Sequence, residues 1–286
     1  MTQNVLVIAF DGMDKELIDQ FDLDHVTQDE YGQIDNHTDI TRIKTGELFA
    51  SFITGKTWKE HGIRGLKGWD SEFMNAVEGA VPNREPFYSW AARVKDVFTR
   101  ATGVERRTFT REDLACPTMF DTVPDAVAVN VPSYNENAGI EVFSKVLDQY
   151  GIEYAEREAE KEHRERTIEF WDAMEGEAHT LLMAHFHYLD SINHLFGDVM
   201  EDEERLEAAY RKIDEFAGEI IEEASGRYDT IIFMSDHGLP EGPGHNENAF
   251  YSSNVELFPD KEPHITDFHD AIVDRVGAQD LHGVEV

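Results

Sequence analysis

Aspartate and histidine residues follow three short apolar runs of this sequence, each at the point where the run ends. Asp11 follows the first run, Asp190 the second and Asp236 the third. Three histidines lie near the second and third of these aspartates in the sequence: His194, His237 and His245. Carboxylate and neutral imidazole groups together are ligands that zinc and manganese take in proteins. These six residues are therefore candidates for a metal site.

The spacing of these residues suits a shared site. Asp190 and His194 are four residues apart, which places both side chains on one face of a helical turn. Asp236 and His237 are adjacent, and a glycine follows them, so the backbone can turn at this point. The two side chains can then bind two different ions or the same ion. Asp11 taken alone also suits a helix N-cap, and an isolated Asp–His pair is usually a solvated surface contact. The joint occurrence favours metal binding.

Four apolar runs have the length and β-branched composition of strands buried in a parallel sheet. They are Val5–Phe10, Ala126–Val131, Thr180–Phe186 and Thr230–Met234. Segments with helical periodicity lie at 153–178 and 201–224, and residues 86–100 show a less regular helical pattern. This alternation predicts an α/β fold, a three-layer sandwich with a mostly parallel central sheet. Ligands bind beyond the carboxyl ends of such strands, where the aspartates and histidines fall.

A threonine extends this pattern. Thr45 is followed after nine residues by Thr54-Gly55 and after seven more by His61-Gly62. The order of all these motifs resembles the nucleotide pyrophosphatase/phosphodiesterase branch of the alkaline phosphatase superfamily. The matching motifs are Asp11-Gly12, Thr45, Thr54-Gly55, His61-Gly62, Asp190-x-x-x-His194-x-x-Gly197, Ser235-Asp236-His237-Gly238 and His245. They are short islands, but they follow the order of that family from one end of the chain almost to the other.

The resemblance implies an alkaline phosphatase-like fold and a two-metal phosphohydrolase. One ion is expected at Asp190, His194 and His245. The other is expected at Asp11, Asp236 and His237, with the Thr45 oxygen as an additional ligand. Thr45 is then the nucleophile, because metal coordination stabilises its alkoxide, and it forms a covalent intermediate.

The expected substrate is a small phosphorylated molecule such as a nucleotide, cleaved at a phosphodiester or nucleotide pyrophosphate bond. The expected cofactors are two divalent ions, zinc or manganese. A threonine before a glycine at a helix start is also typical of an N-cap, so Thr45 has a structural alternative.

Three other classes of protein fit the sequence less well. A non-catalytic metal-binding or assembly module could retain the fold, but it has no physical need for seven clustered polar groups whose burial is costly. A sulfatase of the superfamily needs Cys-x-Pro-x-Arg, whereas Pro117 directly follows Cys116 and Phe120 stands in place of the arginine. A phosphosugar mutase has a large inserted domain, and the segment from Thr45 to Asp190 is long enough for only part of such a domain.

The charge balance excludes some partners. The 286 residues include 59 acidic and 25 basic ones, a net charge of −34, spread along the whole chain. Such a field repels nucleic-acid backbones and anionic membrane surfaces, so neither is an expected partner. The spread is typical of a salt-adapted surface and predicts a halophilic host.

The remaining features concern organisation and location. Cys116 is the only cysteine, which excludes an intrachain disulfide. No run approaches the roughly 18 apolar residues of a membrane helix, and the start lacks a basic signal segment, so we expect a cytoplasmic protein. We expect a single catalytic domain over residues 1–286, with a cap or insertion around 68–124, where periodicity is least clear. The sequence indicates no oligomeric state.

Overall fold

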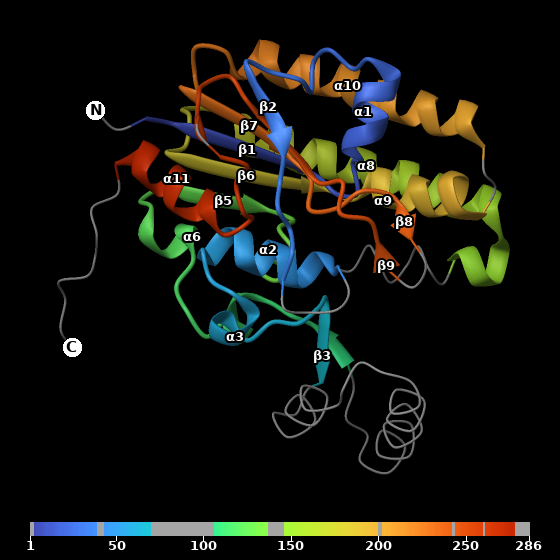
Figure 1. Cartoon of the computed structure of the whole chain (residues 1–286), viewed down its shortest axis with the longest axis horizontal. Coiled ribbons are helices and arrows are strands. Elements are labelled where there is room, and N and C mark those ends of the chain that lie inside the picture. The colour runs from blue at the N-terminus through green and yellow to red at the C-terminus, as the bar shows by residue number, and fades with distance from the viewer. Residues whose placement is uncertain are drawn as a thin grey trace.

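A six-stranded sheet forms the centre of the molecule (Figure 1). The computed structural model describes residues 3–38, 43–69, 106–136, 146–199, 202–241, 244–259 and 261–277. Across the sheet the strands are β2 (Glu30–Gln33), β10 (Phe250–Ser253), β7 (Thr230–Met234), β1 (Val5–Phe10), β6 (Leu181–Phe186) and β5 (Ala126–Val129). β10 runs antiparallel to both of its neighbours, and the other pairings are parallel. The prediction of a mostly parallel central sheet is confirmed.

The four predicted apolar runs are the strands β1, β5, β6 and β7. β1 and β7 have the predicted bounds, β6 begins one residue later, and β5 ends two residues earlier. Every residue of β1, β6 and β7 is buried, as expected for strands covered on both faces. β5 is only partly buried because it is the edge strand. The short strands β2 and β10 were not predicted.

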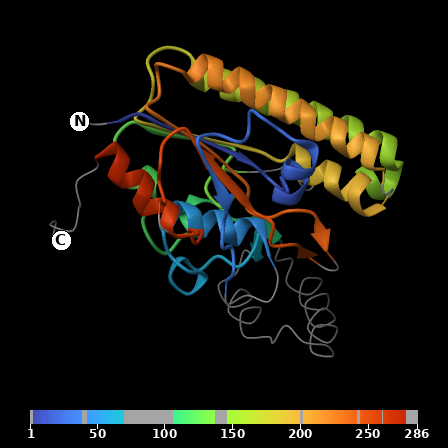
Figure 2. The same cartoon turned by 45° about the horizontal axis from the view of Figure 1, so that its top comes forward.

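Helices cover both faces of the sheet and complete three layers (Figures 1 and 2). One face carries α1 (Lys15–Phe21), α8 (Ile152–Met174), α9 (Tyr188–Ile192), the π-helical segment η2 (Asn193–Val199) and α10 (Glu203–Ala224). The other face carries α2 (Thr45–Thr54), α6 (Met119–Thr122) and α11 (Asp267–Val276). Successive side chains of a strand point to opposite faces, so each face of β1 feeds a separate apolar core. The α/β three-layer sandwich is confirmed.

The two long helical patterns correspond to α8 and α10. α8 ends at Met174, four residues before the predicted end, and α10 begins at Glu203, two residues after the predicted start. The candidate helix at 86–100 lies outside the described residues. Residues 70–105, most of the cap or insertion expected around 68–124, also lie outside the described residues. The cap or insertion therefore stays a prediction.

The other described elements are short. They are α3 (Trp58–His61), β3 (Lys67–Trp69), β4 (Arg106–Thr108), η1 (Arg111–Asp113), β8 (Pro240–Glu241) and β9 (Gly244–His245). β3 pairs antiparallel with β4, and β8 with β9. Among the helices that the structure describes, none combines the length and apolar character needed to cross a membrane.

Candidate metal centre

The carboxyl ends of three neighbouring strands bring the predicted site residues together. β7, β1 and β6 are adjacent and parallel, so Asp236, Asp11 and the segment with Asp190 leave the sheet side by side. Gly12 has φ +71°, and a Cβ at this position would lie 3.0 Å from the Asp190 Cα. A side chain there would separate the two loops. The glycine after Asp11 therefore lets Asp11 and Asp190 approach each other.

One group of ligand atoms comes from Asp190, His194 and His245, all within 4.8 Å of one another. The Asp190 Oδ1 lies 3.3 Å from the His245 Nε2 and 3.7 Å from the His194 Nε2. The two Nε2 atoms are 3.2 Å apart. Three donor atoms from two loops therefore converge on one point.

A second group comes from Asp11, Asp190 and His237, again within 4.8 Å. The His237 Nε2 lies 3.3 Å from the Asp11 Oδ1 and 3.4 Å from the Asp236 Oδ2. It is also 3.2 Å from the Thr45 Oγ1. The structure thus places all seven predicted residues in one cluster, with Asp190 between the two groups.

The carboxylates of this cluster are buried. Asp11 and Asp236 are 0% exposed and Asp190 is 8% exposed. Within the described part of the chain, no hydrogen bond reaches the Asp11 Oδ1 or either Asp236 oxygen. Each such buried carboxylate costs several kcal/mol unless a cation compensates it. Oxygen and imidazole donors in this arrangement fit divalent ions such as zinc or manganese.

Burial and mutual repulsion shift the proton affinities of these groups. Burial, and next the charge of Asp236, raise the pKa of Asp11 well above its usual value. Burial would also raise the pKa of Asp190, but hydrogen bonds from His187 and His245 outweigh it and hold that pKa well below the usual range. Burial lowers the pKa of His237. Protons and metal ions therefore compete for the same buried oxygens and nitrogens.

The helix-cap alternatives for Asp11 and Thr45 are taken by other residues. The carboxylate that caps α1 belongs to Asp14, which accepts hydrogen bonds from two backbone amides of that helix. Lys44 holds the N-cap position of α2, and Thr45 is the first helical residue. The Asp11 carboxylate and the Thr45 hydroxyl both lie in the cluster instead.

Two histidines that sequence reasoning missed hold the carboxylates in place. His185 is fully buried within β6, and its Nε2 lies 2.9 Å from the Asp11 Oδ2. The His187 Nε2 lies 3.0 Å from the Asp190 Oδ2. Each histidine engages the second oxygen of a carboxylate whose Oδ1 belongs to the cluster. A histidine inside an otherwise apolar strand was the available signal for His185.

Asp14 connects three parts of the site. Its carboxylate accepts hydrogen bonds from the backbone amide of Leu239, at 3.0 Å, and from the Asn246 side chain, at 2.8 Å. A Cβ on Gly238 would lie 2.2 Å from the Asp14 Oδ2, so this close approach requires glycine. The carboxylate thus holds the loop of His237 and the loop of His245 against the start of α1.

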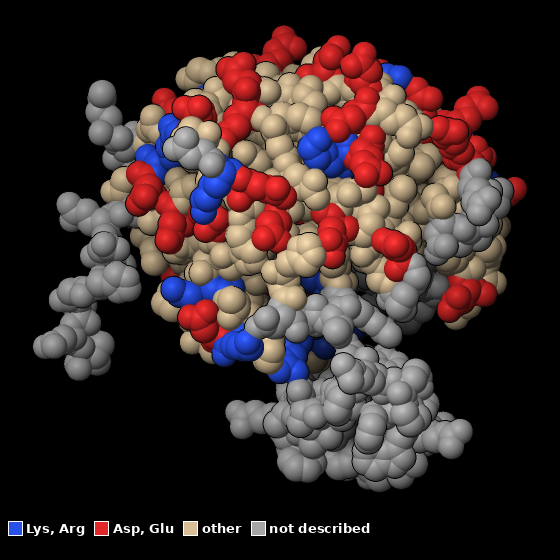
Figure 3. All heavy atoms as spheres, in the orientation of Figure 1, with Lys and Arg blue, Asp and Glu red and all other residues tan. Residues whose placement is uncertain are grey.

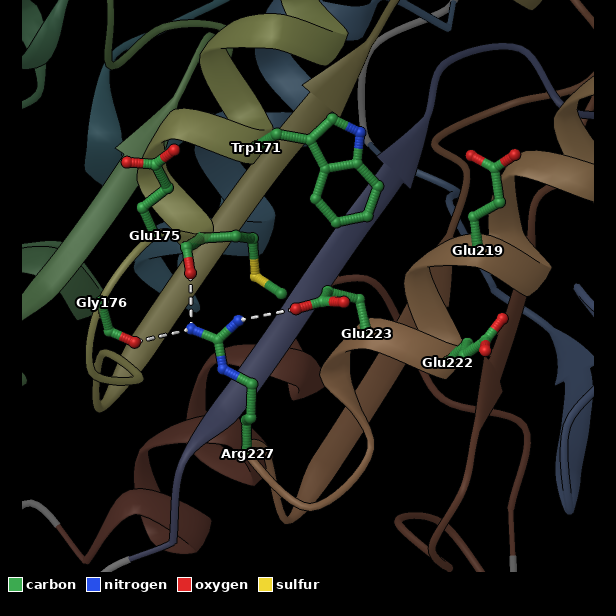
Figure 4. Close-up of a pocket in the computed structure, with 8 residues that line it drawn as sticks. Trp171, Glu175, Gly176, Glu219, Glu222, Glu223 and Arg227 are labelled. Carbon is green, nitrogen blue, oxygen red and sulfur yellow. Dashed lines mark hydrogen bonds and ion pairs between the residues drawn. The ribbon is translucent and has the colours of Figure 1, made fainter.

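One described cavity lies away from this cluster. It has a volume of about 760 Å³ and is lined by Trp171, Met174, Glu175, Gly176, Glu219, Glu222, Glu223 and Arg227 (Figure 4). The Arg227 guanidinium donates to the carbonyls of Met174 and Gly176 and faces Glu223. These residues stand where α8 and α10 end, ahead of β6 and β7, so the cavity is at the opposite end of the sheet from the aspartates. Its arginine serves to join the two helix ends.

Comparisons with known proteins agree with the fold. The family model described as type I phosphodiesterase/nucleotide pyrophosphatase matches residues 5–274. No curated protein is similar enough in sequence to count as a match. The chain is similar to BT1596, a 2-O GAG sulfatase, with 9% identity, a TM-score of 0.55, and coverage of 99% of this chain and 72% of that one. It is also similar to PH0037 from Pyrococcus horikoshii, with 10% identity, a TM-score of 0.50, and coverage of 99% and 100%.

A further similar structure is the murine ectonucleotide pyrophosphatase/phosphodiesterase 5, with 16% identity and a TM-score of 0.43. That match covers 82% of this chain, which spans 57% of the length of the murine protein. At such low sequence identities, structural similarity shows only that the fold is shared. The family match is different, since it extends over the sheet and over every residue of the cluster from Asp11 to His245. The chain belongs to the type I phosphodiesterase/nucleotide pyrophosphatase family, within the alkaline phosphatase superfamily.

Proposed function

We propose that the protein is a two-metal phosphohydrolase that cleaves phosphodiester or nucleotide pyrophosphate bonds through a covalent intermediate on Thr45. One observation carries the proposal. The Thr45 Oγ1 lies 3.2 Å from the His237 Nε2, at the edge of a cluster of three buried aspartates. A hydroxyl group in such a cluster has the surroundings that a metal-activated nucleophile needs.

The first ligand set is the first group of donor atoms, and the second set takes Asp236, whose Oδ2 lies 3.4 Å from the His237 Nε2, in place of Asp190. Asp190, His194 and His245 would hold one ion. Asp11, Asp236 and His237 would hold the other, with the Thr45 oxygen beside them. When bound, divalent ions would favour the alkoxide of the threonine and neutralise charge on the phosphoryl oxygens. Zinc and manganese both suit these donors.

Helix α2 supports the same role for Thr45. Thr45 is the first residue of this ten-residue helix, whose N-terminal end carries partial positive charge. An anionic phosphoryl group on the Thr45 oxygen would therefore be stabilised by the helix end. Thr45 is 7% exposed, which limits the water around the hydroxyl. The oxygen of Thr45 would bond to phosphorus as the ester oxygen of the substrate leaves, and water would later release the phosphoryl group.

The direct experiment replaces Thr45. Thr45→Ala should lower kcat for bis(p-nitrophenyl) phosphate by orders of magnitude, while the protein stays folded and is still stabilised by zinc. Thr45→Ser should keep part of the activity because the hydroxyl remains. These outcomes are read from initial rates, with melting temperatures measured in zinc and in chelator.

Thr54→Ala is the matched control. Thr54 is also buried on α2, but it stands at the opposite end, where its hydroxyl donates to the Ala50 carbonyl. This variant should lose some stability and keep its turnover. Near-full turnover by Thr45→Ala would show that another group attacks. Bound metal without turnover of any phosphate ester would instead favour a non-catalytic module with the same fold.

The finer properties of the enzyme belong to this proposal as well. The substrate would be a small phosphorylated molecule such as a nucleotide. The salt-adapted host and the cytoplasmic location stay predictions from the sequence.

A further inference from the structure

The loop that follows β5, residues 130–135, has an unusual backbone. Two of its residues that are not glycine have left-handed conformations, Asn130 with φ 57° and Ser133 with φ 62°. Such conformations are uncommon outside glycine and persist only where surrounding contacts fix the backbone. Both residues are buried, since Asn130 is 6% exposed and Ser133 is 0% exposed. Contacts of these two buried side chains therefore help to hold the loop in a strained conformation.

Ser133 connects this loop to the helix of the proposed nucleophile. Its hydroxyl donates a hydrogen bond to the Gly46 carbonyl, at 2.7 Å. Gly46 is the second residue of α2 and directly follows Thr45. The loop after β5 therefore holds the first turn of α2 at the residue next to Thr45.

Asn130 connects the same loop to the metal cluster. Its side-chain amide donates to the His185 carbonyl, at 3.2 Å. The His185 Nε2 in turn lies 2.9 Å from the Asp11 Oδ2. Asn130 and Ser133 are only three residues apart, so one turn of the chain is anchored both to the support of Asp11 and to the start of α2.

The turn between these two anchors is held by further contacts. The Val131 amide donates to the Asn135 side-chain oxygen at 2.8 Å, and the Asn135 amide donates to the Val131 carbonyl at 2.9 Å. The Tyr134 carbonyl accepts a hydrogen bond from the Arg111 backbone amide at 3.0 Å. Val131 is also 0% exposed, within the apolar core on the α2 side of the sheet. The turn is therefore a fixed support against which α2 can be placed.

We propose that Ser133 is a positioning residue for the nucleophile. Its hydrogen bond to Gly46 fixes the start of α2, and with it the Thr45 hydroxyl, which lies 3.2 Å from the His237 Nε2. The inference rests on the proposed function. Helix ends fray unless other contacts hold them. A displacement of a reacting group by about 1 Å can lower a rate about a hundredfold, so a fixed helix start has a direct effect on catalysis.

Two substitutions of Ser133 test this inference. Ser133→Ala removes the hydroxyl, and Ser133→Gly removes it while relieving the backbone strain, because glycine readily adopts positive φ. Both should lower kcat for bis(p-nitrophenyl) phosphate about tenfold to a hundredfold. KM, and the zinc affinity measured by calorimetry, should change less than threefold, because the lost hydrogen bond joins the hydroxyl to the backbone of α2. The glycine variant keeps the test valid if the alanine variant folds poorly.

Amide hydrogen exchange gives a second readout, which needs neither substrate nor metal. The amides of Glu47 and Leu48 donate to the Lys44 carbonyl and form the first turn of α2. In both Ser133 variants, mass spectrometry should show these amides exchanging several-fold faster than in the parent, relative to the amides of β7. The β7 amides serve as the reference because core strands exchange through global unfolding.

Ser252→Ala is the matched control. Ser252 lies on β10, is also 0% exposed, and donates its hydroxyl hydrogen to the Val26 carbonyl at 2.5 Å. This variant loses a buried hydrogen bond of the same kind away from α2. It should lose stability while kcat and the relative exchange at the start of α2 stay at parent values.

The outcomes separate this inference from the proposed function. Parent values of kcat and of exchange at the start of α2 in both Ser133 variants would overturn the inference, and so would a loss of zinc affinity as large as the loss of kcat. If Thr45→Ala abolishes turnover and the Ser133 variants match the parent, the inference alone fails. If Thr45→Ala keeps its turnover, the proposed function fails, whatever the Ser133 variants do.

Discussion

Three aspartate side chains share one buried space at the ends of β1, β6 and β7. His185 holds one oxygen of Asp11 and His187 holds one of Asp190, whereas neither carboxylate oxygen of Asp236 accepts a hydrogen bond from any described residue. The Asp236 charge also helps to raise the pKa of Asp11. Without metal, no described hydrogen bond offsets the burial of the Asp236 carboxylate, so its charge is costly.

This cost predicts an unusual change in melting temperature when the Asp236 charge is removed. In chelator, Asp236→Asn should raise the melting temperature by about 2–4 °C, the effect of about 1 kcal/mol in a chain of this size. In zinc, the same variant should gain much less stability than the parent, because a ligand is lost. Thermal unfolding of both proteins in both buffers measures the two effects.

Asp214→Asn serves as the control for this prediction. Asp214 is also buried, but its Oδ1 accepts hydrogen bonds from the backbone amides of His25 and Val26. Its neutralisation should destabilise the protein equally in chelator and in zinc. If Asp236→Asn behaved in the same way, the aspartate would be a structural residue and not a metal ligand.

Residue types and spacing predicted that the aspartates and histidines meet, and the family resemblance added Thr45. The seven predicted residues lie in one cluster because each follows a strand end or starts the helix beside it. The supporting residues could not be predicted in this way. His185 contacts Asp11 across 174 residues of sequence, and Asp14 contacts Asn246 across 232. Such partners are set by strand register and by loop packing, which no local pattern encodes.

At the scale of elements, the first turn of α2 fits closely against the chain before β3. Gly46 makes this possible, since a Cβ would lie 2.4 Å from a backbone oxygen. Gly46→Ala should therefore destabilise the protein by about 1–3 kcal/mol, although alanine favours helices by about 1 kcal/mol over glycine. The variant should also have a lower kcat than its loss of stability explains, because the adjacent residue is Thr45. Urea unfolding and initial rates measure the two quantities.

Gly218→Ala provides the comparison for this change. Gly218 lies within α10, where the three atoms nearest to an added Cβ all belong to the partly exposed side chain of His25. That side chain can move, so the variant should be neutral or stabilised. Equal behaviour of the two alanine variants would contradict a tight fit at Gly46.

Helix α8 carries a histidine whose surroundings predict a pH effect. The His163 ring stacks on Tyr188 at 4.9 Å and meets the edge of Phe216 at 5.5 Å, and burial lowers its pKa to about 4. In the unfolded chain this pKa is about 6.5. Between pH 6.5 and 4 the unfolded state thus binds a proton that the folded state does not, so stability falls as the pH falls.

The corresponding test compares the parent with His163→Phe. Between pH 7 and pH 5, the parent should lose about 1–2 kcal/mol more of its unfolding free energy than the variant does. Burial lowers the pKa of His61 to about 4 as well. His61 is present in both proteins, so it changes their unfolding free energies equally with pH. Urea titrations at the two pH values give the difference. Parallel pH profiles would mean that His163 is protonated in the fold.

The elements themselves were only partly predictable. Long apolar or periodic segments predicted β1, β5, β6, β7, α8 and α10, because burial on both faces or on one stripe leaves a clear pattern. β2 has the sequence Glu-Tyr-Gly-Gln and lacks an apolar run. Its pairing with β10 and the packing of Tyr31 near Phe250 determine its strand conformation. Strands of this kind depend on tertiary contacts.

At the scale of the whole molecule, the acidic surface predicts a dependence on salt. Red side chains predominate over blue ones on the face shown in Figure 3, and the net charge is −34. Screening of this self-repulsion should raise the melting temperature steadily between 0.1 and 2 M KCl. The rise should be smaller in a double variant, Glu219→Gln with Glu222→Gln, because these side chains share one cavity wall (Figure 4).

Arg227→Gln completes this comparison, since it removes a positive charge from the same cavity. Its melting temperature should depend more strongly on salt than that of the parent. A melting temperature that is independent of KCl in all three proteins would refute a salt-adapted surface.

The position of β1 in the sheet has a consequence for synthesis of the chain. β1 is central and wholly apolar, and its two neighbours begin at Leu181 and Thr230. At 5–20 residues per second, a ribosome needs roughly 9–35 s to proceed from Val5 to Leu181. Throughout that time the strand Val5–Phe10 has no partner, and unpaired apolar strands aggregate. The nascent chain therefore depends on early collapse around β1, or on a chaperone, well before His245 exists to complete the metal centre.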